Sequence, residues 1–194
     1  MVRLVVTGTP GVGKTTVAIE LSKAYDAPVV DINEIIRPVL KWDPELQTSL
    51  VIDEVKAREL IREDLGGAGS YIIDTVAINL IDKSLIDWCI VLRLDPRQVM
   101  DRLLKRNWPR CKIVENVLAE VVGSPPLNLA IDVFGRDRVI EVDTTNKDAH
   151  EVANHIVNQL TVGVPVIGVV DWLDTLDTDF ILNLSRELDD CLAQ

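Results

Sequence analysis

The chain has 194 residues, of which 47% are hydrophobic and 26% are charged. That length supports one good hydrophobic core and leaves too little chain for two domains, so we expect one compact globular domain. The 31 acidic residues outnumber the 20 basic ones and give a net charge of −11. This excess repels a phosphate backbone and argues against direct, sequence-independent binding of nucleic acid, whereas a basic or neutral partner suits it.

The cysteines and the apolar segments bear on the compartment. Cys89, Cys111 and Cys191 are odd in number and far apart, and no paired spacing indicates a disulfide framework or a zinc site. We therefore expect reduced cysteines and a cytoplasmic protein. The apolar run near the N-terminus is too short for a signal peptide, and the longest apolar stretch, residues 162–170, is about half a membrane span. We expect no segment that crosses a bilayer.

The first part of the chain predicts strands that alternate with helices. The predicted strands are residues 3–6, 28–32 and 71–74, and the predicted helices are residues 14–25, 32–40 and 53–65. Asp43-Pro44 breaks the helical spacing of the second helix. Gly66-Gly67 ends the third helix as a C-terminal stop. The two helices between the second and third strands carry polar faces.

The rest of the chain continues the alternation. Two more strands are predicted at residues 88–92 and 139–142, with helices from Asp95-Pro96, over 113–122, up to Phe134, and over 148–160. Residues 161–194 predict an irregular connector and an acidic helix with Leu176, Phe180, Leu184 and Leu188 on one stripe. This order is typical of an α/β fold with a parallel sheet covered by helices on both sides.

A phosphate-binding motif follows the first predicted strand. Residues 8–15, Gly-Thr-Pro-Gly-Val-Gly-Lys-Thr, match glycine, any four residues, glycine, lysine and serine or threonine, and a predicted helix follows them. The glycines let backbone N–H groups turn toward an anion, and the helix N-terminus adds partial positive charge. We predict that this P-loop binds ATP, with Lys14 on the outer phosphates and the Thr15 hydroxyl on Mg²⁺. The binding residues are Gly11, Val12, Gly13, Lys14, Thr15 and Thr16.

Asp74 is a second candidate, because it ends the third predicted strand. A carboxylate there faces the P-loop across the carboxyl edge of a parallel sheet, where it would hold Mg²⁺ through a water molecule. The alternative is an aspartate that only forms a turn after the strand.

Arg102 and Arg106 lie four residues apart on one predicted helix, so their guanidinium groups share a face. We predict that they contact adenine and neutralise charge on the transferred phosphate, with Arg110 joining them from the following break. The alternative for such a pair is a solvated helix face.

Other classes of site fit less well. Asn146-Lys147-Asp148 is similar to the guanine-reading motif of GTPases, but its aspartate comes one residue early. Asp64-Leu65-Gly66-Gly67 is similar to a GTPase switch motif, but it precedes the third strand. His150 and His155 fit no metal spacing and are expected on the surface.

These motifs together resemble the adenylate kinase 6 family of nucleoside monophosphate kinases, also called CINAP proteins, over residues 1–160. The shared features are the P-loop, Arg37 as a monophosphate-binding arginine, and a lid with Arg-x-x-x-Arg at Arg102 and Arg106. The resemblance implies a P-loop NTPase fold of three layers, α/β/α, with five parallel strands. It also implies a monophosphate-binding segment at about 31–65, a lid at about 106–112, and a C-terminal extension at 161–194.

The resemblance implies an activity as well: reversible transfer of phosphate between ATP and AMP, with Mg²⁺. Catalysis would fall to Lys14, Asp74, Arg102 and Arg106. Members of that family also resemble ATPases that act in maturation of the small ribosomal subunit and bind a basic ribosomal protein. This chain departs from them at Val76, where the family usually has a histidine. Three hypotheses follow: an adenylate kinase, an ATP-dependent assembly factor, and a kinase for another small acceptor.

Overall fold

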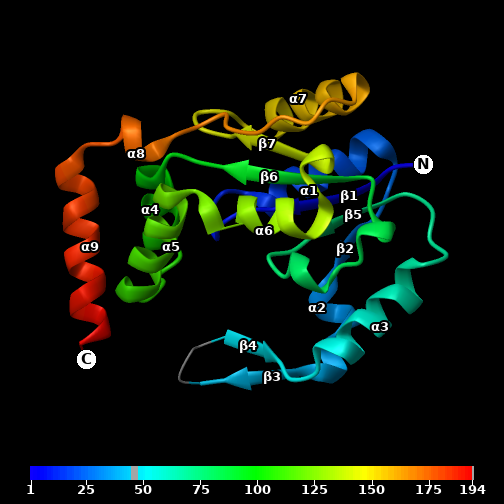
Figure 1. Ribbon diagram of the computed structural model, residues 1–194, viewed down its shortest axis with the longest axis horizontal. Helices are drawn as coiled ribbons and strands as arrows, with labels where there is room; N and C mark the ends of the chain where they lie inside the picture. The colour runs from blue at the N-terminus through cyan, green and yellow to red at the C-terminus, as the bar shows by residue number, and fades with distance from the viewer. Residues whose placement is uncertain (45–47, 194) are drawn as a thin grey trace.

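A parallel β-sheet forms the centre of the molecule. The computed structural model describes residues 1–44 and 48–193. The five strands run in the order β2-β5-β1-β6-β7 and pair in parallel throughout. They are β1 (Arg3–Thr7), β2 (Val29–Asp31), β5 (Tyr71–Asp74), β6 (Trp88–Arg93) and β7 (Val139–Asp143). Helices cover the sheet on both faces (Figure 1), which confirms the predicted three-layer α/β/α architecture.

Two hydrophobic cores flank the sheet, because successive residues of a strand point to opposite faces. Leu4 and Val6 belong to one core, and Val5 between them belongs to the other. The first core is covered by α1 (Lys14–Tyr25), α4 (Pro96–Lys105), α5 (Arg110–Val122) and α7 (Ala149–Val162). The second is covered by α3 (Glu54–Leu65) and α6 (Ser124–Phe134). The alternation of strands and helices read from the sequence is therefore confirmed.

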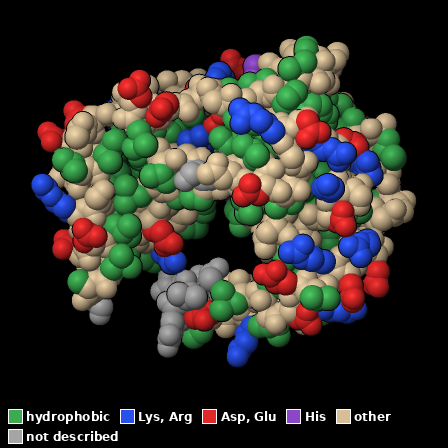
Figure 2. Space-filling view, viewed as in Figure 1, with side chains coloured by type: hydrophobic (Ala, Val, Ile, Leu, Met, Phe, Trp, Pro, Cys, Tyr) green, Lys and Arg blue, Asp and Glu red, His purple; other side chains and the backbone are tan. Residues whose placement is uncertain are grey.

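The segment between β2 and α3 differs from the prediction. Helix α2 covers only Ile32–Ile35, and a 3-10 turn at Arg37–Val39 replaces most of the rest of the predicted helix. Two antiparallel strands, β3 (Leu40–Asp43) and β4 (Thr48–Val51), follow it and were not predicted. Pro38 explains the early end, since a proline disfavours the helical conformation of the residue before it and lacks an N–H group. Figure 2 shows a hollow between this segment and the body of the molecule.

The C-terminal residues fold back onto the body. Val166 forms a parallel bridge with Ile140 at the edge of the sheet. Helix α8 (Trp172–Thr175) and helix α9 (Thr178–Leu192) follow, and α9 packs on α5 (Figure 1). Leu184 is buried and joins the first core, and Phe180 and Leu188 pack against it. The apolar stripe predicted for the last helix thus faces the body of the protein.

The expectation of reduced cysteines is wrong for one pair. Cys111 of α5 and Cys191 of α9 form a disulfide, with their Cα atoms 5.7 Å apart. The bond joins residues 80 positions apart in the sequence, which is why their spacing gave no sign of it. Cys89 is free and buried in β6.

One observation concerns membranes. No single helix among the described residues is long and apolar enough to cross a bilayer, and α5 passes that test only together with residues 125–134, from which a 60° bend separates it.

We predict that the disulfide contributes strongly to stability. It closes a long loop, and such a cross-link restricts the unfolded chain, so reduction should lower the free energy of unfolding by about 3 kcal/mol. Urea unfolding with and without a reductant measures the change. In a Cys111→Ser, Cys191→Ser double variant the reductant should have no effect. An unchanged midpoint for the reduced wild-type protein would contradict the prediction.

Candidate functional site

The turn between β1 and α1 forms a cradle of backbone amides at the carboxyl edge of the sheet. Gly8, Gly11 and Gly13 adopt positive φ angles of 141°, 95° and 104°. At Gly8 an added Cβ would lie 2.5 Å from the carbonyl oxygen of Leu92, so only glycine fits there. No side chain of the described residues caps the N-terminus of α1. The amides of its first turn are therefore available to an anion.

Lys14 is the first residue of α1, and its ammonium group lies in this turn. Nζ donates to the carbonyl oxygens of Gly8 at 3.0 Å and Thr9 at 3.1 Å. Burial lowers the pKa of Lys14 to about 8; the carboxylates of Asp74 and Glu120 raise this pKa, and the charge of Arg106 lowers it. Lys14 is thus a partly desolvated amine within the cradle, and its charged form would attract a phosphate.

Thr15 and Asp74 lie together, as the sequence predicts. The Thr15 hydroxyl donates to Oδ2 of Asp74 at 2.5 Å. Asp74 is brought there by the register of the sheet, which places it beside Val6 of β1. A hydroxyl and a carboxylate are hard oxygen donors, and Mg²⁺ in phosphate-binding sites takes one or two such groups together with phosphate oxygens. The residues present fit a magnesium ion.

Arg102 and Arg106 flank a pocket beside the P-loop. Nη1 of Arg102 donates to the carbonyl oxygen of Gly11 at 3.1 Å. The pocket has a volume of about 320 Å³ and is lined by Val12, Gly13, Thr16, Val17, Arg102, Arg106, Thr144, Lys147, Asp148, Ala149 and Val152. Both arginines therefore contribute to the wall of one pocket next to the P-loop. The apolar side chains of the pocket suit a flat heterocycle.

Two other arginines lie elsewhere. Arg37 is exposed in the segment after β2 and forms an ion pair with Glu34. Arg110 does not join the pocket, contrary to the prediction: its guanidinium forms a two-armed ion pair with Glu187 of α9, at 2.7 and 2.9 Å. The prediction placed Arg110 in the polar break between two helices. Arg110 is instead the first residue of α5, and this helix directs its side chain toward α9.

The residues that are similar to a GTPase motif have structural contacts. Asp148 caps the N-terminus of α7 by accepting from the Glu151 amide at 2.9 Å. Asn146 accepts from Gln98 at 2.8 Å, and Nζ of Lys147 donates to the carbonyl oxygen of Asp143 at 2.6 Å. These bonds give the three residues structural roles, and Lys147 and Asp148 also line the pocket. His150 is exposed beside Glu20.

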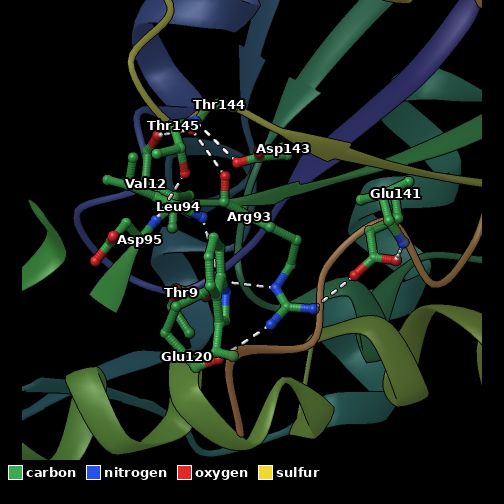
Figure 3. A network of polar contacts seen from close by, with 12 residues as sticks. Thr9, Val12, Arg93, Leu94, Asp95, Glu120, Glu141, Asp143, Thr144 and Thr145 are labelled. Carbon is green, nitrogen blue, oxygen red and sulfur yellow. Dashed lines mark hydrogen bonds and ion pairs between the residues drawn. The ribbon is translucent and has the colours of Figure 1, made fainter. Parts of the chain in front are cut away.

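A buried network of charges behind the P-loop was missed by sequence reasoning (Figure 3). Arg93 of β6 pairs with Glu120 of α5 at 2.7 Å and with Glu141 of β7 at 2.5 Å. The Thr9 hydroxyl of the P-loop donates to Glu120. All three charged side chains are nearly inaccessible. The signal in the sequence was the charged residue at the end of the apolar strand β6, Arg93, and the one within the apolar strand β7, Glu141. A charge that is buried in a strand needs a partner.

The parallel sheet and the amide cradle together define a P-loop nucleotide-binding protein. Residues 4–123 match the family model described as "AAA domain". A protein from Saccharolobus islandicus named "Putative adenylate kinase" is 33% identical over 187 residues, which cover 94% of each chain. Proteins of the same name from Methanocaldococcus jannaschii and Thermococcus kodakarensis are 32% and 34% identical and cover 89% and 90% of this chain. The chain belongs to the AAA domain family and is a homologue of these archaeal proteins.

Solved structures share the fold. A gluconokinase from Sinorhizobium meliloti 1021 has a TM-score of 0.56 at 16% identity and covers 83% of this chain and 92% of its own. An uncharacterized protein from Eubacterium ventriosum ATCC 27560 has a TM-score of 0.54 at 13% identity and covers 83% of this chain and 98% of its own. At such identities the likeness concerns the arrangement of helices and strands.

We predict that ATP binding takes up a proton at mildly alkaline pH. With a pKa of about 8, Lys14 is largely neutral at pH 8.5 in the free protein, and a bound polyphosphate favours its charged form. Uptake should exceed roughly half a proton per ATP at that pH, and affinity should fall as pH rises further. Calorimetry in buffers of different ionisation enthalpy measures this. Lys14→Arg keeps its charge and should take up none; equal uptake in that variant would contradict the assignment.

Proposed function

We propose that the protein is an adenylate kinase-type phosphotransferase, which transfers the terminal phosphate of ATP to AMP with Mg²⁺. The observation that carries the proposal is the placement of Lys14 within a cradle of amides, where it interacts with the charges of Asp74, the partner of Thr15, and of Arg106 in the pocket wall. The name of the archaeal homologues supports the choice of a nucleotide acceptor. A kinase for another small acceptor uses the same cradle and differs in what it phosphorylates.

Each residue has a role in this proposal. The amides of the P-loop and Lys14 hold the outer phosphates of ATP, and Arg102 and Arg106 neutralise charge that develops on the transferred group. Mg²⁺, when bound, would be held by Thr15 and, through water, by Asp74, and it supplies neutralisation of phosphate oxygens. No side-chain base is needed, because the attacking phosphate of AMP is already an anion.

The acceptor would bind on the other side of the P-loop. We assign residues 31–65 to the monophosphate-binding segment, with Arg37 as its phosphate ligand, and residues 106–112 to the lid. Support comes from the hollow beside the hairpin (Figure 2) and from the exposed position of Arg37. In this arrangement residues 1–160 form the kinase domain and residues 161–194 form an extension that braces α5. A cytoplasmic location is part of the same proposal.

The activity test is direct. Purified protein should form ADP from ATP plus AMP in the presence of Mg²⁺, and Lys14→Ala should reduce the rate to below about 1%, because it removes the cation that contacts the transferred phosphate. A panel of nucleoside monophosphates identifies the preferred acceptor. Hydrolysis of ATP at a rate that AMP does not change would overturn the kinase and favour an ATPase.

Two arginines at opposite ends of α4 offer a matched comparison. Arg106→Gln removes a charge from the pocket wall and should lower kcat roughly a hundredfold. Arg97→Gln removes a charge of the same kind that lies over the ring of Phe180 in α9, outside the pocket lining and the lid, and should leave kcat unchanged. Steady-state kinetics at saturating ATP and AMP measure both. Equal losses in the two variants would contradict the role of Arg106.

The second candidate is an assembly factor that binds a basic ribosomal protein of the small subunit in an ATP-dependent manner. The net charge of −11 favours it, as does the acidic C-terminal segment, where Asp171, Asp174, Asp177 and Asp179 precede or open the last helix. An ATPase step would belong to this role. Nucleotide-dependent retention of a small-subunit protein on the immobilised chain separates it from the kinase.

A further inference from the structure

Glu120 of α5 joins the P-loop to the end of β6 and to the C-terminal segment. Its carboxylate oxygen Oε2 accepts from the hydroxyl of Thr9 in the P-loop. The other oxygen, Oε1, accepts from Nε of Arg93 at 2.7 Å, from the amide of Leu94 at 3.2 Å and from the indole Nε1 of Trp172 at 3.2 Å. Only 1% of Glu120 is exposed, so water does not compete for these bonds.

Thr9 transmits this contact to the phosphate cradle. Its carbonyl oxygen accepts from Nζ of Lys14 at 3.1 Å, and from the amide of Val12 at 3.4 Å. The side chain of Thr9 is therefore tied to the buried carboxylate while its backbone forms part of the turn that would meet a phosphate. A shift of Thr9 moves a partner of the phosphate-binding lysine.

The same network reaches the C-terminal segment by a second route. Glu141 accepts from Nη1 of Arg93 at 2.5 Å, and its other oxygen accepts from the amides of Gly168 at 2.6 Å and Val169 at 3.0 Å. The backbone of the segment between α7 and α8 is thus bound to Glu141, and the indole of Trp172, the first residue of α8, is bound to Glu120. Arg93 lies between the two carboxylates (Figure 3).

Stability alone is a weak reason for this arrangement. The desolvation of a buried ion pair commonly offsets its attraction, and apolar side chains of similar volume stabilise a core as well. Here two carboxylates share one guanidinium, which leaves excess negative charge in the core. The charges instead fix the positions of their partners, because hydrogen bonds to charged groups are short and strong and hold each donor in a defined place.

We propose that Glu120 is a positioning residue for ATP: it fixes Thr9 and with it the P-loop, and it makes ATP affinity depend on the C-terminal segment through Trp172. The inference rests on the proposed use of the P-loop for ATP. It does not depend on which acceptor receives the phosphate. Trp172 touches Glu120 and lies outside the pocket lining, so its effect on ATP is exerted through the carboxylate.

A double-mutant cycle tests the proposal. Thr9→Val and Trp172→Phe each remove one donor to Glu120, keep most of the side-chain volume, and leave the ion pair between Arg93 and Glu120 in place. We expect each single variant to raise the Kd for ATP roughly fivefold, and the double variant to raise it by clearly less than the product, because both act through one carboxylate. Calorimetry on the full-length protein gives the four values.

Two matched controls are available. The Thr7 hydroxyl is buried without a hydrogen-bond partner among the described residues, so Thr7→Val removes a buried hydroxyl close to the P-loop without touching the network. Trp88 is the first residue of β6 and lies at the amino end of the parallel strands, whereas the P-loop lies at their carboxyl end. Trp88→Phe therefore changes an indole far from the P-loop. Both should bind ATP as the wild type does. Thermal unfolding verifies that all variants are folded.

A spectroscopic readout separates positioning from a merely structural role. With ¹⁵N-labelled tryptophan, the indole N–H signal of Trp172, assigned from Trp172→Phe, should shift when ATP is added to the wild type and should not shift in Thr9→Val at saturating ATP. An unchanged Kd in Trp172→Phe, a fully multiplicative cycle, or an indole signal that ignores ATP in the wild type would overturn the proposal. If the wild type bound no ATP, the proposed function itself would fail instead.

Discussion

The P-loop depends on a close approach between two backbones. The chain leaves β1 and passes over the carboxyl end of β6, its parallel neighbour, so closely that a Cβ at Gly8 would collide with the carbonyl oxygen of Leu92. The next residue of that strand is Arg93, whose side chain turns into the core. The strand end on which the loop rests therefore also carries the guanidinium that organises the carboxylates behind it. The phosphate cradle and the buried charge network therefore both depend on the end of β6, at Leu92 and Arg93.

The central fold and the cradle were predictable because their signals are local. Apolar strands followed by helical spacing determine an alternating α/β chain, and the spacing of Gly8, Gly13 and Lys14 determines the turn. The partnership of Thr15 with Asp74 followed from topology, since the carboxyl ends of neighbouring parallel strands meet at one edge. That Arg102 and Arg106 point the same way also followed, because residues four apart on a helix share a face, and both line the pocket.

Other features depend on contacts that the sequence order does not reveal. The spacing of Cys111 and Cys191 says nothing of the packing of α9 on α5 that brings their sulfurs together. The apolar residues from Ile32 to Leu40 have helical spacing, but Pro38 ends the helix early, and the strands β3 and β4 that follow were not predicted. Glu120 lies on a helix whose pattern leaves open whether it faces water. Only the assembled fold shows that this residue points toward Arg93.

Helix α5 links the C-terminal segment to the phosphate site. Its first turn carries the disulfide and the ion pair to α9, and its last turns carry Glu120 and Gly123. A Cβ at Gly123 would lie 2.8 Å from Nη2 of Arg93, so the helix must end in a residue without a side chain for the guanidinium to fit. Segments far apart in the sequence therefore meet along a single helix.

This arrangement also answers an electrostatic problem of the P-loop. Burial lowers the pKa of Lys14, and the positive charge of Arg106 acts in the same direction, whereas Asp74 and Glu120 oppose them. A neutral lysine would not attract a phosphate, so a cradle deep enough to exclude water needs negative charge nearby. Asp74 supplies it from the side where a metal ion would bind, and a cation there would cancel much of its effect. Glu120 acts from behind the loop, where no ligand reaches it, and its contribution persists when the site is filled.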